Sequence, residues 1–388
     1  MAIPTLAMIP SGYKLNKVYS VLPTDGSGDL VTARTSTATR VNSDGLIEEV
    51  AIGVPRLDYT DGGCPSLLLE PSSTNLITES EAFDNAYWTK SGATVTSGFS
   101  APSVDSPLGA FKLVNTLQTD KDLGLGVTVS ANVGSTYTSS IWLKGEGSNI
   151  GKSIFIRGKR SSGGPYVGAD LTVVLTSEWK RFSTAPLTLV TGNNAYRIIL
   201  SSNDATDCLI FGAQLEEQSS ATSYIPTAGT TISRTADSAS KSGISNLIGQ
   251  TEGVLYAEIS ALANDGTSRY MSINSGSNAN EILYGFSVSG NYLRLRANSL
   301  TVFETTISGL DALIYHKFAI KYKSGDWSIY INGSKMDLGN ETFSFTSNIN
   351  ELEFSGASGS PFFGKCKDLR IYKSADMTDS ELQILTTI

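Results

Sequence analysis

The residues that could carry chemistry in this chain are few, and the first of them are two closely spaced carboxylates. Glu351 and Glu353 stand two positions apart in Asn350-Glu-Leu-Glu-Phe354, so a strand would place both on one face. A retaining glycosidase needs two carboxyl groups about 5–5.5 Å apart. The same spacing also suits an ordinary solvent-side face with Leu352 and Phe354 turned inward, and we favour that interpretation.

Histidine and cysteine chemistry is restricted by number. His316 is the one histidine, so a Ser-His-Asp or Cys-His site would have to be built on it, and a histidine-rich metal site is excluded. The cysteines Cys64, Cys208 and Cys366 are far apart and odd in number, which excludes a disulfide framework and a zinc knuckle. We expect a surface or edge histidine and buried free thiols. The sequence therefore predicts no catalytic residue and no enzyme.

Aromatic rings are candidates for ligand binding, because sugars stack on exposed aromatic faces. The four tryptophans are Trp88, Trp142, Trp179 and Trp327. Each stands in or beside a strand-like run, and Trp142 lies between two aliphatic residues. We therefore predict core positions for the tryptophans and seek the ligand contacts among the tyrosines.

A tyrosine in a polar loop is the first candidate for glycan binding. Tyr166 follows Gly163-Gly-Pro165, which predicts a loop, and cations precede it in the sequence. Arg157 ends a strand whose opposite face carries Ile154 and Ile156, the better core face. A loop tyrosine beside cations can stack on a sugar and form hydrogen bonds with it. Tyr166 and Arg157 are therefore our first predicted glycan-binding residues.

A second candidate surface follows from strict alternation near residue 290. Tyr292 and Arg294 alternate with Leu293 and Leu295, so the tyrosine and arginine should face outward. We predict Tyr292 and Arg294 as further glycan-binding residues. The alternative is a solvated sheet face that keeps an edge soluble.

Calcium is the one cofactor that the sequence leaves open. Asn264-Asp-Gly266, or Asp204 with Asp207, could supply oxygen ligands. No dense acidic loop is present, which argues against calcium, and we expect no cofactor.

Charge and hydropathy restrict the partners. The chain has 388 residues and a net charge of -8, with 29 basic and 37 acidic residues. No run of Lys or Arg exceeds two residues, which argues against nucleic acid, since an anionic backbone would be repelled. No apolar run reaches the ~18 residues of a membrane span. The N-terminus also lacks the basic region and apolar core of a signal peptide.

Short strand-like runs separated by polar turns fill the chain and predict an all-β fold. Lys317–Lys323 alternates apolar and charged residues, as an antiparallel strand with one wet face does. Asn332-Gly333 predicts a hairpin turn. The end of the chain predicts a short helix over Met377–Leu385, with Thr378 as N-cap and Glu381 completing a capping box. Helix should stay well below the ~30% average.

The pattern predicts two antiparallel β-sandwiches behind an extended N-terminal arm. We expect the arm over residues 1–74, a jelly roll over 75–235 and a second sandwich over 236–388, with the boundary in the small, polar stretch 226–243. The apolar residues of the arm are too sparse for an independent core. We expect the arm to pack on the 75–235 domain or on other chains.

Three stretches carry a resemblance to known families. The first stretch resembles a segment of bacteriophage tail-fibre and other virion appendage proteins, and it comprises residues 38–48, 55–59 and 64–76. Residues 64–76 read Cys-Pro-Ser-Leu-Leu-Leu-Glu-Pro-Ser-Ser-Thr-Asn-Leu. The second stretch is similar to the carbohydrate-binding-module-like jelly rolls of such proteins, and it comprises residues 80–90, 211–217 and 224–227. Residues 80–90 read Ser-Glu-Ala-Phe-Asp-Asn-Ala-Tyr-Trp-Thr-Lys. Residues 244–388 resemble a laminin-G, concanavalin-A-like sandwich.

The resemblance implies a non-catalytic virion appendage, a tail fibre or receptor-binding protein, that attaches to host surface glycans. It also implies a homotrimer and contacts of the N-terminal arm with other virion proteins, in a particle outside the cell. The first alternative is a tail-associated polysaccharide depolymerase, although hydrolases related to the concanavalin-like sandwich use three alternating acids and position 355 is serine. The others are a purely structural virion decoration protein and a secreted bacterial glycan-binding module.

Overall fold

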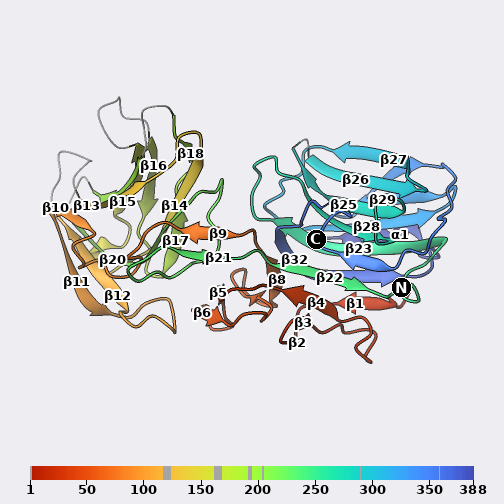
Figure 1. Ribbon diagram of the computed structural model, residues 1–388, viewed down its shortest axis with the longest axis horizontal. Coiled ribbons are helices and arrows are strands. Elements are labelled where there is room, and N and C mark those ends of the chain that lie inside the picture. Colours follow the sequence, from red (N-terminus) through yellow and green to blue (C-terminus); the bar gives the residue numbers. More distant parts are fainter. Residues whose placement is uncertain are drawn as a thin grey trace. The chain divides into compact units, whose positions relative to one another are not determined.

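The computed structural model describes residues 2–116, 124–160, 168–190, 195–202, 205–288, 290–357 and 359–388. Strands take up 49% of these residues and helices 3%, so the predicted all-β fold class is confirmed (Figure 1). The chain divides into two compact units. Unit 1 consists of the N-terminal segment to Thr37, Val50–Pro71 and Ala236–Ile388, and unit 2 consists of Ala38–Glu49 and Ser72–Thr235.

Unit 1 is a sandwich of two antiparallel sheets. Sheet 1 has the strand order β30-β29-β28-β23-β32-β8-β7, with β1 also pairing β32. Sheet 2 has the order β2-β3-β4-β22-β31-β24-β25-β26-β27. The strands of sheet 1 are β30 (Ser334–Gly339), β29 (Trp327–Ile331), β28 (His316–Lys323), β23 (Glu252–Ala261), β32 (Gly364–Tyr372), β8 (Ser66–Leu69), β7 (Leu57–Asp58) and β1 (Leu6–Met8). The strands of sheet 2 are β2 (Tyr13–Lys14), β3 (Lys17–Val18), β4 (Leu30–Ala33), β22 (Ser238–Ser242), β31 (Glu351–Glu353), β24 (Arg269–Asn274), β25 (Glu281–Ser287), β26 (Gly290–Ala297) and β27 (Leu300–Ile307).

The core of unit 1 lies between its two sheets, where the alternation of each strand places the apolar side chains. Phe318, Ile320 and Tyr322 of β28 are buried, as the sequence predicts. Phe318 packs on Tyr284 of β25 across the interior, with ring centroids 3.9 Å apart. Such contacts between sheets, together with the removal of apolar surface from water, stabilise the sandwich.

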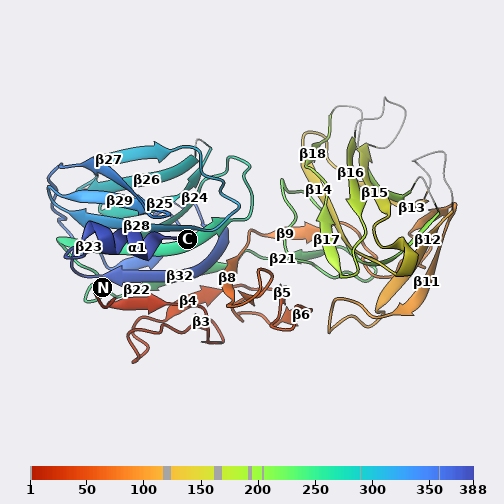
Figure 2. The ribbon, with the colours of Figure 1, turned by 180° about the vertical axis from the view of Figure 1, so that it is seen from behind.

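The N-terminal segment completes this sandwich. Leu6 of β1 pairs with Ile371 of β32, Leu67 of β8 pairs with Cys366 of β32, and β4 pairs with β22. Both views of the chain show β1, β4 and β8 beside β32 and β22 (Figures 1 and 2). The sequence predicts that residues 1–74 pack on the 75–235 domain or on other chains. The first alternative is wrong for residues 2–37 and 50–71, which belong to unit 1, and contact with other chains stays a prediction. The physical reason is that their few apolar side chains, Leu6 among them, complete the interior of unit 1.

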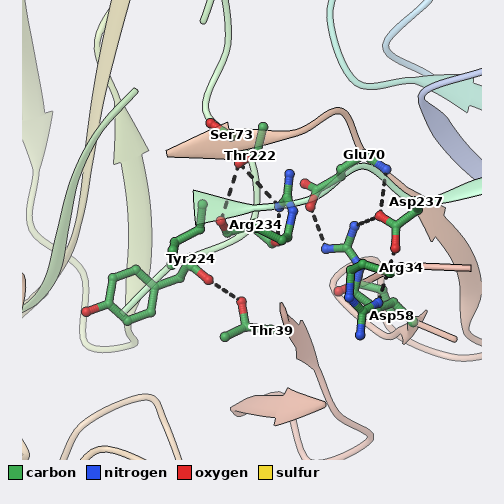
Figure 3. Close-up of polar contacts among 12 residues, drawn as sticks. Arg34, Thr39, Asp58, Glu70, Ser73, Thr222, Tyr224, Arg234 and Asp237 are labelled. Atoms are coloured by element: carbon green, nitrogen blue, oxygen red, sulfur yellow. Dashed lines mark hydrogen bonds and ion pairs between the residues drawn. The ribbon is translucent and has the colours of Figure 1, made fainter. Parts of the chain in front are cut away.

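A buried ion cluster ties the N-terminal segment to the start of the C-terminal part of unit 1. Arg56 is 1% exposed, and its guanidinium contacts the carboxylates of Glu70 and Asp237. Arg34 Nη1 lies 3.2 Å from Asp237 Oδ1, and the Glu70 N–H donates to Asp237 Oδ2 at 3.0 Å (Figure 3). Burial lowers the pKa of Arg56, but the two carboxylates outweigh it and hold the pKa above its usual value.

The end of the chain folds as its sequence predicts. Helix α1 (Asp379–Thr386) begins after Thr378, and the capping box between Thr378 and Glu381 is present. Leu382 and Leu385 of the helix join a second apolar cluster with Tyr330 of β29. The Asn332-Gly333 turn joins β29 to β30 with both residues at positive φ, 50° and 81°, as a hairpin of this type requires.

Unit 2 is also a sandwich of antiparallel sheets. Sheet 3 has the order β10-β13-β19-β15-β16, and sheet 4 has the order β11-β12-β20-β14-β17, with β18 also pairing β14. The strands of sheet 3 are β10 (Thr89–Ser91), β13 (Gly124–Ser130), β19 (Ala195–Ser201), β15 (Ser153–Arg160) and β16 (Gly168–Val174). The strands of sheet 4 are β11 (Ala93–Phe99), β12 (Ala110–Asn115), β20 (Thr206–Glu216), β14 (Thr136–Gly145), β17 (Lys180–Ser183) and β18 (Leu187–Thr188). The described part of unit 2 also contains two two-stranded sheets and one short 3-10 helix. One sheet pairs β9 (Ser73–Asn75) with β21 (Ile232–Arg234), and the other pairs β5 (Ala38–Val41) with β6 (Ile47–Val50). The 3-10 helix is η1 (Gly147–Asn149).

The interior of unit 2 follows the predicted alternation of β15. Ile154 and Ile156 are fully buried and pack with Leu143 and Phe111 of sheet 4. Trp88 is buried in the same core, as predicted. At one end of this unit, the buried Glu216 carboxylate accepts hydrogen bonds from the Ser73 hydroxyl at 2.7 Å and from the backbone N–H of Thr222 at 2.9 Å.

Replacing Arg56 by leucine tests the ion cluster. The Arg56→Leu variant leaves Glu70 and Asp237 buried without this partner, and we expect unit 1 to lose about 3–5 kcal/mol of stability. Trp327 is the one tryptophan in unit 1, so its ¹⁹F NMR signal in fluorotryptophan-labelled protein reports urea unfolding of that unit.

The matched control is Lys335→Ala, which removes a surface ion pair to Asp379 at 2.7 Å. A surface pair contributes at most about 1 kcal/mol. Equal losses for the two variants would contradict a stabilising role for the buried cluster.

Candidate functional site

Two tyrosines meet on the outer face of sheet 2. The register places Tyr270 of β24, Gly285 of β25 and Tyr292 of β26 in one row across three strands. Tyr270 and Tyr292 alternate with the buried Met271 and Leu293, so both rings point away from the core, as predicted for Tyr292. The ring centroids are 5.3 Å apart with planes tilted by 38°.

Gly285 makes this contact between the rings feasible. It carries no side chain, so the two flanking tyrosines can meet above its strand. A Cβ atom on Gly285 would lie 2.0 Å from the carbonyl oxygen of Arg269, closer than any real contact. Position 285 therefore has to remain glycine for β24 and β25 to pair as they do.

Arg294 lies in the adjacent row and is held by a buried carboxylate. Its Nη2 atom is 2.6 Å from Oε2 of Glu281, a side chain that is 0% exposed. The other oxygen of Glu281 accepts a hydrogen bond from the Ala357 N–H at 2.9 Å. Burial lowers the pKa of Arg294, but Glu281 outweighs it, so the pKa is raised and the side chain stays charged.

The hydroxyl of Tyr292 stays protonated over the physiological pH range. Burial, followed by a hydrogen bond with Glu304, raises the pKa of Tyr292 to about 12. Tyr292 thus keeps a hydrogen-bond donor beside a carboxylate and a guanidinium. The Tyr270 hydroxyl donates to Ser268 Oγ at 3.0 Å. We call Tyr270, Gly285, Tyr292 and Arg294 the tyrosine face.

This arrangement offers the contacts that a sugar ring needs. Half-buried aromatic rings accept the apolar face of a sugar, and adjacent charged and hydroxyl groups can bind its hydroxyls. Tyr292 and Arg294, predicted together from the alternation of one strand, lie on the same outer face of β26 as expected. Tyr270 was not predicted, because only the register of β24, β25 and β26 shows that it neighbours Tyr292.

The predicted residues in unit 2 have a different outcome. Arg157 lies on the face of β15 away from the core, as predicted, but it is only 6% exposed. Its guanidinium forms two hydrogen bonds with Asp170, at 3.0 and 3.2 Å. The expected exposure of Arg157 is therefore wrong, because an ion pair across β15 and β16 covers it. Tyr166 lies outside the described residues, and the part of both residues in glycan binding stays a prediction.

The carboxylates Glu351 and Glu353 share the outer face of β31, with Leu352 buried as predicted. Glu353 Oε2 accepts hydrogen bonds from Asn274 Nδ2 and Ser355 Oγ, each at 3.2 Å. Burial and then the neighbouring Glu353 raise the pKa of Glu351. The two acids are therefore electrostatically coupled on a solvent-side face.

His316 is buried, so the expected surface or edge histidine is wrong. It is 1% exposed, and its Nδ1 and Nε2 atoms lie 2.8 Å from Asn332 Nδ2 and 2.7 Å from the Asp311 carbonyl. These two partners satisfy both ring nitrogens, which allows the ring to be buried.

The cysteines divide into two buried thiols and one exposed thiol. Cys208 and Cys366 are free and buried as predicted, and burial raises the pKa of Cys208 to about 12. Cys64 is exposed instead, because it follows the tight turn at Gly62-Gly63. The two buried thiols are poor nucleophiles, since the thiolate is the reactive form.

The carboxylates considered for calcium have other partners where the structure describes them. Asp265 pairs with Arg269 at 2.7 Å, and Asp207 pairs with Lys112 at 3.3 Å. Asp204 lies outside the described residues. Within the described ranges, no three His, Cys, Asp or Glu residues are grouped to hold a metal ion, and no helix has the length and apolar character to cross a membrane. Bound calcium stays a prediction.

Two tryptophans lie outside the sandwich core, contrary to prediction. Ile141 and Leu143 of β14 point into unit 2, so Trp142 between them points to the outer face of sheet 4. Trp142 and Trp179 are half-buried there against Phe211. The strand alternation around Trp142 was the signal that could have placed it. Trp327 is buried as predicted.

The comparisons with known proteins place this chain in no family. No family model and no curated protein matches the sequence. Among solved structures, it is similar to the CBM40 of Ruminococcus gnavus IT-sialidase bound to α2,3 sialyllactose, with 17% identity over 36% of this chain and 84% of that chain and a TM-score of 0.31. The CBM22-1 xylan-binding domain of Paenibacillus barcinonensis Xyn10C matches with 15% identity over 40% of this chain and 94% of that chain, at a TM-score of 0.28.

A third similar structure is domain 4 of AbnA, a GH43 extracellular arabinanase from Geobacillus stearothermophilus, in complex with arabinotriose. It shares 12% identity with this chain over 92% of this chain and 99% of that chain. Its TM-score is 0.23. With TM-scores this low, the similarities identify neither the family nor the ligand of this chain.

A pH titration of stability tests the coupling of the acids on β31. Because the folded-state pKa of Glu351 is raised, the folded protein holds this proton more tightly than the unfolded chain, whose glutamate titrates near about 4.3. Stability should fall as pH rises from that value through the raised pKa. Glu351→Gln should remove this fall, so that the variant gains melting temperature over the parent at neutral pH but not below about pH 4.

Differential scanning calorimetry across this range measures the effect. The control is Glu178→Gln, which changes an exposed carboxylate. A pH-independent difference between parent and Glu351→Gln would contradict the coupling.

Proposed function

We propose that this protein is a non-catalytic glycan-binding protein and that the tyrosine face contacts the sugar. The observation that carries the proposal is the meeting of Tyr270 and Tyr292 above Gly285, with centroids 5.3 Å apart. Aromatic rings on a sheet are fixed before the ligand arrives, so little conformational entropy is lost on binding. Arg294, held by the buried Glu281, adds directed donors beside the rings.

We further propose that the glycan lies on a host cell surface and that the protein is a bacteriophage appendage. The resemblance of residues 38–48, 55–59 and 64–76 to virion appendage proteins supports this part. Exposed apolar side chains on the N-terminal segment, such as Ile3 at 82% and Leu15 at 62%, favour contact with other virion proteins or with copies of this chain. A trimer would multiply weak single sites into firm attachment.

A polysaccharide depolymerase is the second candidate function. The observation that favours it is the coupled pair Glu351 and Glu353, since a raised carboxyl pKa suits a general acid. Glu353, however, is hydrogen-bonded by Asn274 and Ser355, and position 355 holds a hydroxyl where the related hydrolases carry a third acid. We therefore retain binding without cleavage as the proposed function.

Removing the two rings tests the proposal. The double variant Tyr270→Ala/Tyr292→Ala should weaken binding to glycans selected on an array of bacterial surface polysaccharides by at least about tenfold, which corresponds to about 1.4 kcal/mol. The melting temperature should change little, because both rings lie on the outer face.

The matched control is Tyr19→Ala, which removes a tyrosine that is 41% exposed elsewhere in unit 1. Biolayer interferometry on the immobilised glycan measures all variants. Unchanged affinity of a folded double variant would exclude the tyrosine face as the glycan site.

A further inference from the structure

A second aromatic surface lies on the outer face of sheet 4 in unit 2. Trp142 of β14 pairs in register with Arg181 of β17, and the guanidinium carbon lies 4.4 Å from the centroid of the indole. Trp179, two residues before Arg181, packs against the same outer cluster and is also half-buried. An indole in contact with a guanidinium keeps both an aromatic surface and a positive charge at the protein face.

This surface is held rigidly. Arg181 Nη2 donates to the Ser140 hydroxyl at 2.8 Å, and its Nη1 donates to the Thr222 carbonyl. The indole of Trp142 rests on Tyr224 and Phe211, with ring centroids 5.5 and 6.2 Å away. These contacts fix the positions of the ring and of the guanidinium before any ligand binds.

Charge distinguishes this surface from the rest of an acidic chain. The protein carries a net charge of -8, but the outer face of sheet 4 presents Arg181, Lys144 and Lys112. Lys112 and Lys144 flank Leu209 of β20 in register. Asp207 on this face pairs with Lys112 at 3.3 Å, and no carboxylate of the described residues lies within ion-pair distance of Lys144. Glu216 of β20 also lies on this face, with its buried carboxylate bound by Ser73 and Thr222, so the strands of this face carry three cations against two carboxylates.

We infer that Trp142, Trp179, Arg181 and Lys144, here called the tryptophan face, form a second binding site that takes an acidic saccharide. Charge complementarity selects an anionic ligand, and the half-buried indoles stack on the apolar face of a sugar ring. The carboxylate of a uronic acid would lie between Arg181 and Lys144. This inference concerns a different unit from the tyrosine face and does not rest on the function proposed for that face.

A single-stranded nucleic acid is the other ligand that aromatic and basic residues can bind. The observations favour a saccharide, because three cations on one face are few for a phosphate backbone and the rest of the chain is acidic. The oligonucleotide therefore enters the test as a competitor.

The test uses the full chain carrying Tyr270→Ala/Tyr292→Ala, so that the tyrosine face cannot contribute. The probes are oligogalacturonates and other uronate-containing oligosaccharides, each compared with its neutral methyl ester. We expect the acidic form to bind at least about tenfold more tightly than the ester, and binding to weaken as sodium chloride is raised.

Three variants in the same background locate the site. Trp179→Ala should reduce uronate binding at least about tenfold, and Lys144→Gln should reduce both the affinity and its salt dependence. Arg181→Lys keeps the charge but loses the planar guanidinium, so it should weaken uronate binding. This variant tests the site independently if Trp179→Ala does not fold. Lys373→Gln, an exposed lysine of unit 1, is the charge-matched control and should bind as the background does.

Several results would overturn the inference. The first is that the acid and its ester bind equally, or that no acidic probe binds. The second is that Lys144→Gln and Arg181→Lys leave uronate binding unchanged. The third is that a single-stranded oligonucleotide displaces the bound uronate at equal or lower concentration. Because the tyrosine face is absent throughout, these results leave the function proposed for that face untouched.

Discussion

Burial of the Arg56 guanidinium is the constraint on which unit 1 depends. A buried charge costs several kcal/mol unless a partner accompanies it, and Asp237, one of the two carboxylate partners, stands 181 residues further along the chain. Asp237 directly precedes β22, which pairs with β4 and with β31. From β31 the register runs through β24 and β25 to β26. The ion cluster thus anchors the sheet whose far part carries the tyrosine face.

Local patterns were sufficient wherever one face of a strand or a single turn decides the structure. The alternation of β26 places Tyr292 and Arg294 outside because Leu293 and Leu295 need the core. The Asn332-Gly333 hairpin and the capping box at Thr378 rest on contacts within a few residues, so the sequence predicts them without knowledge of the fold. The class of fold follows from the same short-range signals.

Long-range pairing decided the features that the sequence did not show. Tyr270 joins the site only because β24 and β25 pair in one register, and His316 is buried because Asn332 of the turn after β29 binds its ring. Trp142 shows a different failure. Its place between two aliphatic residues suggested a core position, but those neighbours on β14 occupy the interior and turn the indole outward. Which of two faces an apolar run buries depends on what packs against it.

The central claim for this chain is that it binds a glycan without cleaving it, and the claim rests on the aromatic side chains that the strands hold at their outer faces. Rigid aromatic faces on strands favour retention of a glycan, whereas the coupled acids Glu351 and Glu353 offer a route to hydrolysis. The most direct measurement incubates the protein with the glycan that it binds and counts new reducing ends by mass spectrometry over many hours. The account predicts intact glycan that co-purifies with the protein. New reducing ends that disappear in Glu351→Gln or Glu353→Gln would contradict it.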